Sequence, residues 1–173
     1  MNAYKYVALV VTIITAAVLQ PTFFAKFFLP GATPDVLIVV LTCWALLKGP
    51  AVGAIAGFFT GFLIDVLPPG DHLMGISSIF LTLIGYLVGY LSQNQSRSFV
   101  RPLIISASVA NVFFIVRSIW ANLSGSEFSI NIFAVNFLTQ GLYAALLTIF
   151  IYPAIGFLDK KLGPISRAEE LRV

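Results

Sequence analysis

The stretch GPAVGAIAGFFTGFLID, residues 49–65, carries glycine at every fourth position and ends on an aspartate. At helical spacing, Gly49, Gly53, Gly57 and Gly61 fall on nearly one face. Such a stripe is costly in a water-exposed helix, but in lipid it lets a neighbouring helix approach closely. The stripe therefore predicts a packing face around which the chain is assembled. It serves either another helix of the same chain or a second chain, a homodimer included.

The composition is that of an integral membrane protein. Of the 173 residues, 59% are hydrophobic and only 10% are charged, with a mean hydropathy of +0.98. Soluble domains carry about 25% charged residues. The apolar runs do not alternate with polar residues, so they indicate helices and not the strands of a membrane barrel. The single cysteine, Cys43, cannot form an internal disulfide.

Apolar runs and the prolines and polar loops between them predict an all-α, polytopic membrane protein with six transmembrane helices in one compact bundle. We expect a single domain over residues 1–173, with an interfacial loop at 22–34 and a last span that Pro153 interrupts near its end. The expected spans are about 5–20, 35–48, 50–67, 73–91, 102–120 and 132–157, followed by a cytoplasmic tail at 159–173. In the fourth span, Gly75, Gly85 and Gly89 provide a second small face.

The second span is short. Its apolar part would rise only about 18 Å, whereas the hydrocarbon core of a bilayer is about 30 Å thick. Either Asp35 or Lys48 must therefore snorkel, thin the bilayer or line a wet cavity. A re-entrant hairpin formed with the following helix is the alternative.

The basic residues predict the orientation, because cytoplasmic loops carry the excess of lysine and arginine. With both ends of the chain inside, only Lys26 falls in an outer loop and Arg117 lies within a span. The expected cytoplasmic residues are Lys5, Lys48, Arg97, Arg101, Lys160, Lys161, Arg167 and Arg172.

Three charged residues are expected in the outer half of the membrane. Asp35 starts the second span, Asp65 ends the third, and Arg117 lies well into the fifth. Because intramembrane charges are expensive, we expect a polar cluster that fixes the helix arrangement or receives a partner. The simpler interpretation is that each side chain snorkels separately to the headgroups.

Catalytic chemistry has little support, and we predict no catalytic, cofactor-binding or metal-binding residue. His72 is the only histidine, and neither GxSxG nor HExxH occurs. The basic residues are explained by topology, so nucleic-acid binding is not expected. A membrane-embedded enzyme remains a distant alternative.

The order of motifs between Pro34 and Gly89 resembles the MreD family of rod shape-determining membrane proteins. Pro34-Asp35 opens a span, a small-residue helix ends in GFLID at 61–65, and Gly75 opens the next span. The resemblance implies a non-enzymatic scaffold of the machinery for cell-wall elongation and peptidoglycan synthesis, in the bacterial inner membrane. It implies as partners an MreC-like single-span protein, an MreB-like filament, and the RodA polymerase with its penicillin-binding protein.

On this resemblance the glycine stripe, or the second face at Gly85 and Gly89, is a candidate seat for the single MreC helix. A different class fits the same outline, because substrate-binding subunits of energy-coupling-factor vitamin transporters also have six spans, and MreD is thought to share their fold. Such a subunit would recruit Asp35, Asp65, His72 and Arg117 to an outward-facing pocket.

Overall fold

The computed structural model describes residues 3–23, 35–66, 75–92, 100–123 and 130–161, and the structural statements below concern these residues. They form six α-helices and no strand, so the all-helical prediction is confirmed. The helices are α1 Ala3–Phe23, α2 Val36–Lys48, α3 Pro50–Val66, α4 Ile76–Ser92, α5 Val100–Leu123 and α6 Ile130–Lys161.

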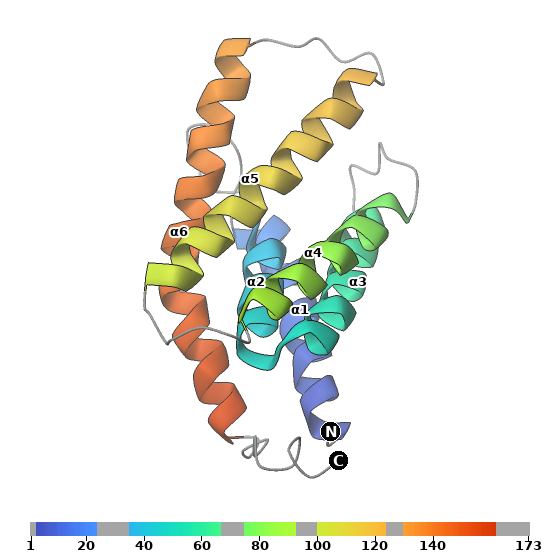
Figure 1. Cartoon of the computed structure of the whole chain (residues 1–173), viewed down its shortest axis with the longest axis vertical. Helices are drawn as coiled ribbons and strands as arrows, with labels where there is room; N and C mark the ends of the chain where they lie inside the picture. The colour runs from blue at the N-terminus through green and yellow to red at the C-terminus, as the bar shows by residue number, and fades with distance from the viewer. Residues whose placement is uncertain (1–2, 24–34, 67–74, 93–99, 124–129, 162–173) are drawn as a thin grey trace.

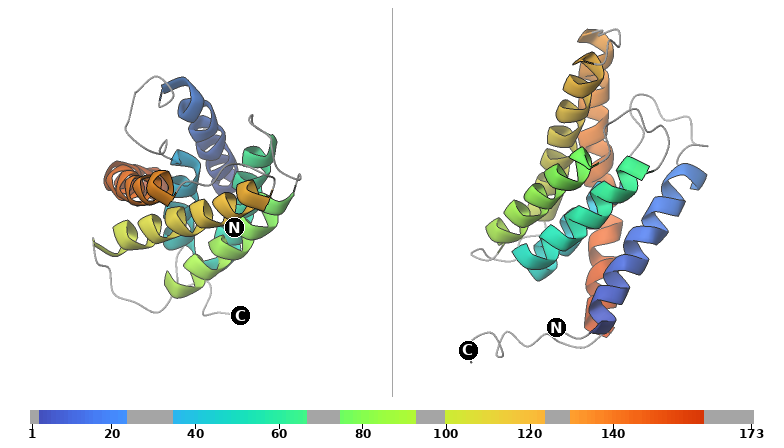
Figure 2. Two further views of the ribbon diagram at one scale, coloured as in Figure 1. Left: turned by 90° about the horizontal axis from the view of Figure 1, so that it is seen from above. Right: turned by 90° about the vertical axis from the view of Figure 1, so that its right-hand side faces the viewer.

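Successive helices run in opposite directions (Figure 1). The start of α1 and the end of α6 lie at the same end of the molecule, and α5 and α6 extend beyond the other helices at the opposite end (Figures 1 and 2). This up-and-down order is the simplest one for helices joined by short connections.

Two prolines lie inside helices. Helix α1 continues through Pro21 to Phe23, so the expected loop starts later than residue 22, and its remainder at 24–34 lies outside the described residues. The expectation that Pro153 interrupts the last span is wrong, because α6 continues through it to Lys161. A proline removes one backbone hydrogen bond, which a long apolar helix tolerates when neighbouring groups compensate.

Helix α2 is the centre of the fold. It contacts each of the other five helices and lies between them in the view from above (Figure 2). Its first ten residues, Val36 to Ala45, are all buried. The glycine stripe suggested α3 as the centre of the fold, but α3 packs mainly on α1, α2 and α4. A helix that is apolar on every face can be surrounded by lipid or by protein, and here the other helices surround it.

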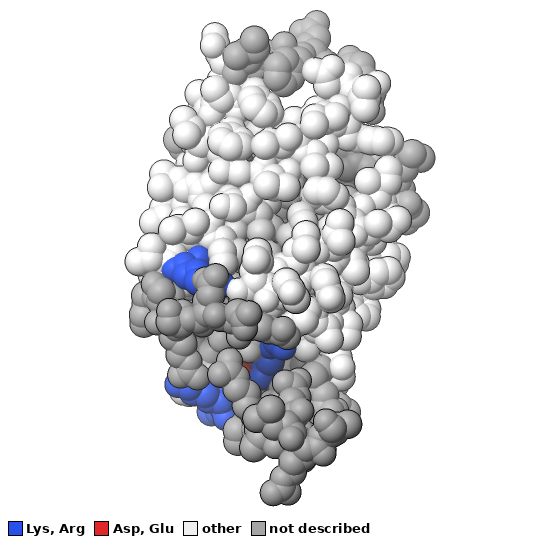
Figure 3. All heavy atoms as spheres, in the orientation of Figure 1, with Lys and Arg blue, Asp and Glu red and all other residues white. Residues whose placement is uncertain are grey.

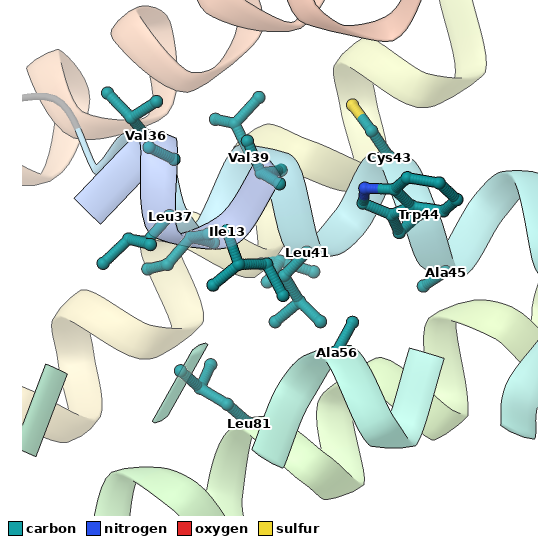
Figure 4. Close-up of a cluster of buried hydrophobic side chains, with 14 of the residues drawn as sticks. Ile13, Val36, Leu37, Val39, Leu41, Cys43, Trp44, Ala45, Ala56 and Leu81 are labelled. Atoms are coloured by element: carbon teal, nitrogen blue, oxygen red, sulfur yellow. The ribbon is translucent and has the colours of Figure 1, made fainter. Parts of the chain in front are cut away.

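The core around α2 consists mainly of aliphatic side chains, and it also contains the Trp44 indole, the Cys43 thiol and the Phe113 ring (Figure 4). Ile13 of α1, Ala56 of α3 and Leu81 of α4 pack against it, and Trp44 is 1% exposed. The Trp44 Nε1 donates a hydrogen bond of 2.9 Å to Thr12 Oγ1, so the buried indole leaves no free donor.

The outer surface is apolar. Ile79, Leu123 and Phe150 are each more than 70% exposed, and many other large apolar side chains cover the outward faces of the helices. The Lys and Arg side chains visible in Figure 3 gather toward the end where α1 begins and α6 ends, and the described part of that face beyond them carries no coloured charge. Such a surface suits a lipid environment.

Candidate functional site: packing faces and a buried polar centre

The glycines of α3 meet the small face of α4 in the same chain. A Cβ added to Gly53 would overlap the carbonyl oxygen of Gly85, and one added to Gly57 would overlap that of Leu81. A Cβ on Gly61 would collide with the backbone of Ser78. The two helices therefore touch backbone to backbone, which only residues without side chains permit.

Two of the predicted face residues have a different role. Gly49 lies in the turn between α2 and α3 with φ of 89°, and its N–H donates to the Ala45 carbonyl at 2.9 Å, which caps α2. Gly75 lies before α4 with φ of 101°, not on its small face. Both φ values are in the left-handed region that favours glycine.

These contacts decide how the glycine stripe is used in this structure. Gly53, Gly57 and Gly61 face α4, while Gly85 and Gly89 face α3 and the turn at Gly49. Of the two uses that the sequence left open, the structure shows packing within the chain. A partner helix would have to displace α4 to reach this face.

Asp35 lies at the start of α2 and forms a buried polar centre. Its Oδ1 accepts a hydrogen bond of 2.7 Å from Gln20 Nε2 of α1, and its Oδ2 accepts one of 3.2 Å from Gln140 Nε2 of α6. The carboxylate also lies at a helix N-terminus, where the helix dipole favours negative charge. Gln140 is ten residues, or about 15 Å, from the first residue of α6. Asp35 therefore lies beside α6 at that distance from the start of the helix.

Arg117 lies close enough to act electrostatically on Asp35 but forms no ion pair with it. Its side chain is exposed. Asp65 lies elsewhere, because its Oδ2 accepts from the backbone N–H of Gly75 at 2.8 Å and of Ser78 at 3.4 Å, at the start of α4. The structure thus brings Arg117 near Asp35 and uses Asp65 as a cap for α4. A shared function of the three residues stays a prediction.

The other end of α2 is also held by side chains. The Lys48 Nζ forms an ion pair with Asp159 Oδ1 of α6, and the Lys48 side chain is 7% exposed. The Ser92 hydroxyl of α4 donates to the Leu46 carbonyl at 2.7 Å. Both charged ends of the short helix therefore find partners inside the protein, so neither has to reach a membrane surface on its own.

Sequence reasoning missed the partners of α2. Gln20 and Gln140 are amides inside or beside apolar runs, and that signal could have marked them as hydrogen-bonding partners for an intramembrane charge. Nothing in the spacing pairs Asp35 with a residue 105 positions away, or Lys48 with one 111 positions away.

No group of three or more histidine, cysteine, aspartate or glutamate side chains lies close enough to hold a metal ion within the described ranges. Asp71 and His72 lie outside the described residues, so their predicted place in an outer loop stays a prediction.

Length and apolar composition make two described helices candidates for membrane spans, over Val100–Trp120 and Asn131–Lys161. Only 22% of the most apolar stretch of each is buried, whereas the core helix of a soluble protein is mostly buried. The other four helices are apolar but shorter. The apolar helices fit a membrane protein, and the described residues make it an all-helical one whose polar side chains join helices.

The chain belongs to the family of the rod shape-determining protein MreD, whose family model matches residues 2–161. The resemblance seen in the sequence is confirmed, and with it a role in determining cell shape. Searches of the curated proteins and of the solved structures gave no match. The vitamin-transporter alternative finds no support in these comparisons.

Proposed function

We propose that this protein is a non-enzymatic scaffold of the cell-wall elongation complex, with six spans in the bacterial inner membrane and both ends in the cytoplasm. The observation that carries the proposal is membership of the MreD family over nearly the whole chain. The family implies rod-shape determination; the scaffold role, the partners and the topology are our inference.

The alternating helix directions support six spans. Six helices that alternate in direction return the chain to the side from which it started (Figure 1). Helix α2 ends on Lys48 and α6 on Lys160 and Lys161, at that same side, as expected for a cytoplasmic face. Helix α2 is too short to cross a bilayer alone, but it is enclosed by the other five helices and needs no lipid contact along its length.

The uses of the polar side chains support a scaffold. Two carboxylates and one ammonium group make contacts that fix helix positions. Asp35 and Lys48 bind side chains of other helices, and Asp65 caps α4. We propose that this rigid bundle holds an MreC-like single-span protein. Through it, the bundle would be linked to an MreB-like filament and to the RodA and penicillin-binding protein synthase.

The experiment that tests the proposal is native mass spectrometry of the gently solubilised protein from its own membranes, combined with depletion in growing cells. We expect co-purification of a single-span protein with a large periplasmic domain, and rounded cells after depletion. Rod-shaped cells after full depletion, or a bound vitamin-sized molecule with no membrane-protein partner, would contradict it.

A further inference from the structure

The face of α5 that points into the bundle is buried along most of its length but becomes exposed toward the end of the helix. Ser106, Ala110 and Phe113 follow one another at helical spacing and are at most 4% exposed. Arg117 is the next position on the same face, one turn beyond Phe113, yet its side chain is exposed. The lipid-facing side of α5 is the opposite one, where Val112, Ile115 and Ile119 are exposed.

The cause of this exposure is the length of α5 and α6. Both helices extend beyond α1–α4 at the end away from the start of α1 (Figures 1 and 2). Arg117 is six residues, or about 9 Å, from the end of α5 that extends. The facing part of α6 is only partly covered as well, and there Phe133 stacks on Phe137 and contacts Phe114 of α5.

Arg117 carries a charge that no described carboxylate neutralises. Its guanidinium forms no ion pair within 4.0 Å among the described residues. Asp35 feels the charge of Arg117, but its two carboxylate oxygens accept their hydrogen bonds from Gln20 and Gln140 and not from the guanidinium. An unpaired guanidinium in the hydrocarbon region of a bilayer is costly, so a site that keeps one favours a negatively charged partner.

We propose that the extending inward face of α5 and α6, around Arg117, Trp120 and Phe133, receives a transmembrane helix of a partner protein. That helix presents an aspartate or glutamate to Arg117. A guanidinium binds a carboxylate through two parallel hydrogen bonds, and the low dielectric of the membrane strengthens such a pair. This proposal rests on the proposed scaffold function. It names the surface of the scaffold that binds the partner and the charge that recognises it.

Within the described ranges, a second copy of the chain offers no free acidic partner, because the three described carboxylates are already engaged. Asp35 is held by two glutamines, Asp65 caps α4, and Asp159 pairs with Lys48. A phospholipid headgroup is the competing occupant, and the crosslinking test below distinguishes it from a transmembrane helix.

The test is site-specific photocrosslinking of the full-length protein in its native membrane. A benzophenone amino acid replaces Trp120, on the inward face near Arg117, and in a matched control it replaces Ile119, which is 57% exposed on the opposite face. The crosslinked peptides are identified by mass spectrometry. We expect the Trp120 probe, and not the Ile119 probe, to capture a transmembrane peptide that contains an aspartate or glutamate.

Charge variants then test the pairing. Arg117→Gln should lower the crosslinking yield at least about tenfold, and Arg117→Lys by less, because lysine keeps the charge but not the planar fork. Arg117→Glu combined with arginine in place of the captured acidic residue should restore the crosslink. Gel filtration of each variant checks that it folds. If Arg117→Glu fails to fold, the crosslinking yield of Arg117→Gln alone tests the pairing.

Several outcomes would overturn the inference. In the crosslinking experiment, they are capture of lipid, of a second copy or of residues 124–129 by the Trp120 probe, and equal capture by both probes. In the variant experiment, it is a crosslinking yield that Arg117→Gln leaves unchanged. If a single-span partner still co-purifies in these cases, the docking surface is wrong while the scaffold function stands. If no membrane protein co-purifies with the unmodified chain, the scaffold function itself fails.

Discussion

At the scale of single residues, the structure shows how an apolar bundle accommodates a carboxylate. Asp35 is 9% exposed and accepts one hydrogen bond on each oxygen, from amides that come from opposite ends of the sequence. An amide supplies a donor without a charge of its own, so the pair needs less desolvation than an ion pair. The same two bonds join α1, α2 and α6.

Replacing Gln140 with leucine tests this arrangement. The substitution keeps similar volume but leaves Asp35 Oδ2 without its donor. We expect the free energy of unfolding to fall by about 1–2 kcal/mol, measured by reversible unfolding in mixed detergent micelles. Asn131→Leu changes an exposed amide of the same helix and should leave stability unchanged. Equal effects of the two substitutions would argue against a special role for the Asp35 centre.

The ion pair of Lys48 and Asp159 is suited to a double-mutant cycle. Each single substitution, Lys48→Met or Asp159→Asn, leaves a partly buried charge alone and should cost about 1–3 kcal/mol. The double variant should lose less than the sum of the two, with a coupling of about 1 kcal/mol or more, because no charge is then left unpaired. Strict additivity would show that the two groups do not stabilise one another.

At the scale of helices, α3 and α4 form a unit whose backbones are in contact. Gly57→Ala would place a methyl group against the Leu81 carbonyl and force the two helices apart. We expect a loss of about 1–3 kcal/mol in the same unfolding measurement. Gly156→Ala is the matched control, since a Cβ there meets nothing within 4 Å and alanine favours a helix by up to about 1 kcal/mol. A stable Gly57→Ala protein would show that the contact between α3 and α4 is not close in the membrane.

The helices themselves were largely predictable, and their arrangement was not. Apolar runs and prolines indicated six helical segments, and each overlaps one helix of the structure. The glycine stripe indicated close packing but not that α4 is the helix that fills it. The central place of α2 was missed because an apolar run such as Val36–Leu47 reads the same whether protein or lipid surrounds it. The Asp35 centre depends on Gln20 and Gln140, and only the tertiary fold brings these two amides to the Asp35 carboxylate.

At the scale of the whole molecule, the proposed six-span topology predicts which residues face each side of the membrane. In a Cys43→Ala background, a single cysteine at His72 should react with an impermeant maleimide on intact cells with the outer membrane opened. A cysteine at Ser166 should react only after the inner membrane is opened as well. Reaction of both cysteines from the same side would exclude the proposed topology. The background change itself should be mild, because Cys43 is a small, fully buried side chain.

The enclosed position of α2 has a consequence for biosynthesis. Both charged ends of this helix depend on α6, through Gln140 at one end and Asp159 at the other, and α6 is the last helix to leave the ribosome. A nascent chain that stops before α6 lacks the Gln140 donor to Asp35 and the Asp159 partner of Lys48. Completion of the bundle is thereby coupled to completion of translation, because a truncated product lacks one hydrogen bond at Asp35 and leaves Lys48 without its ion pair.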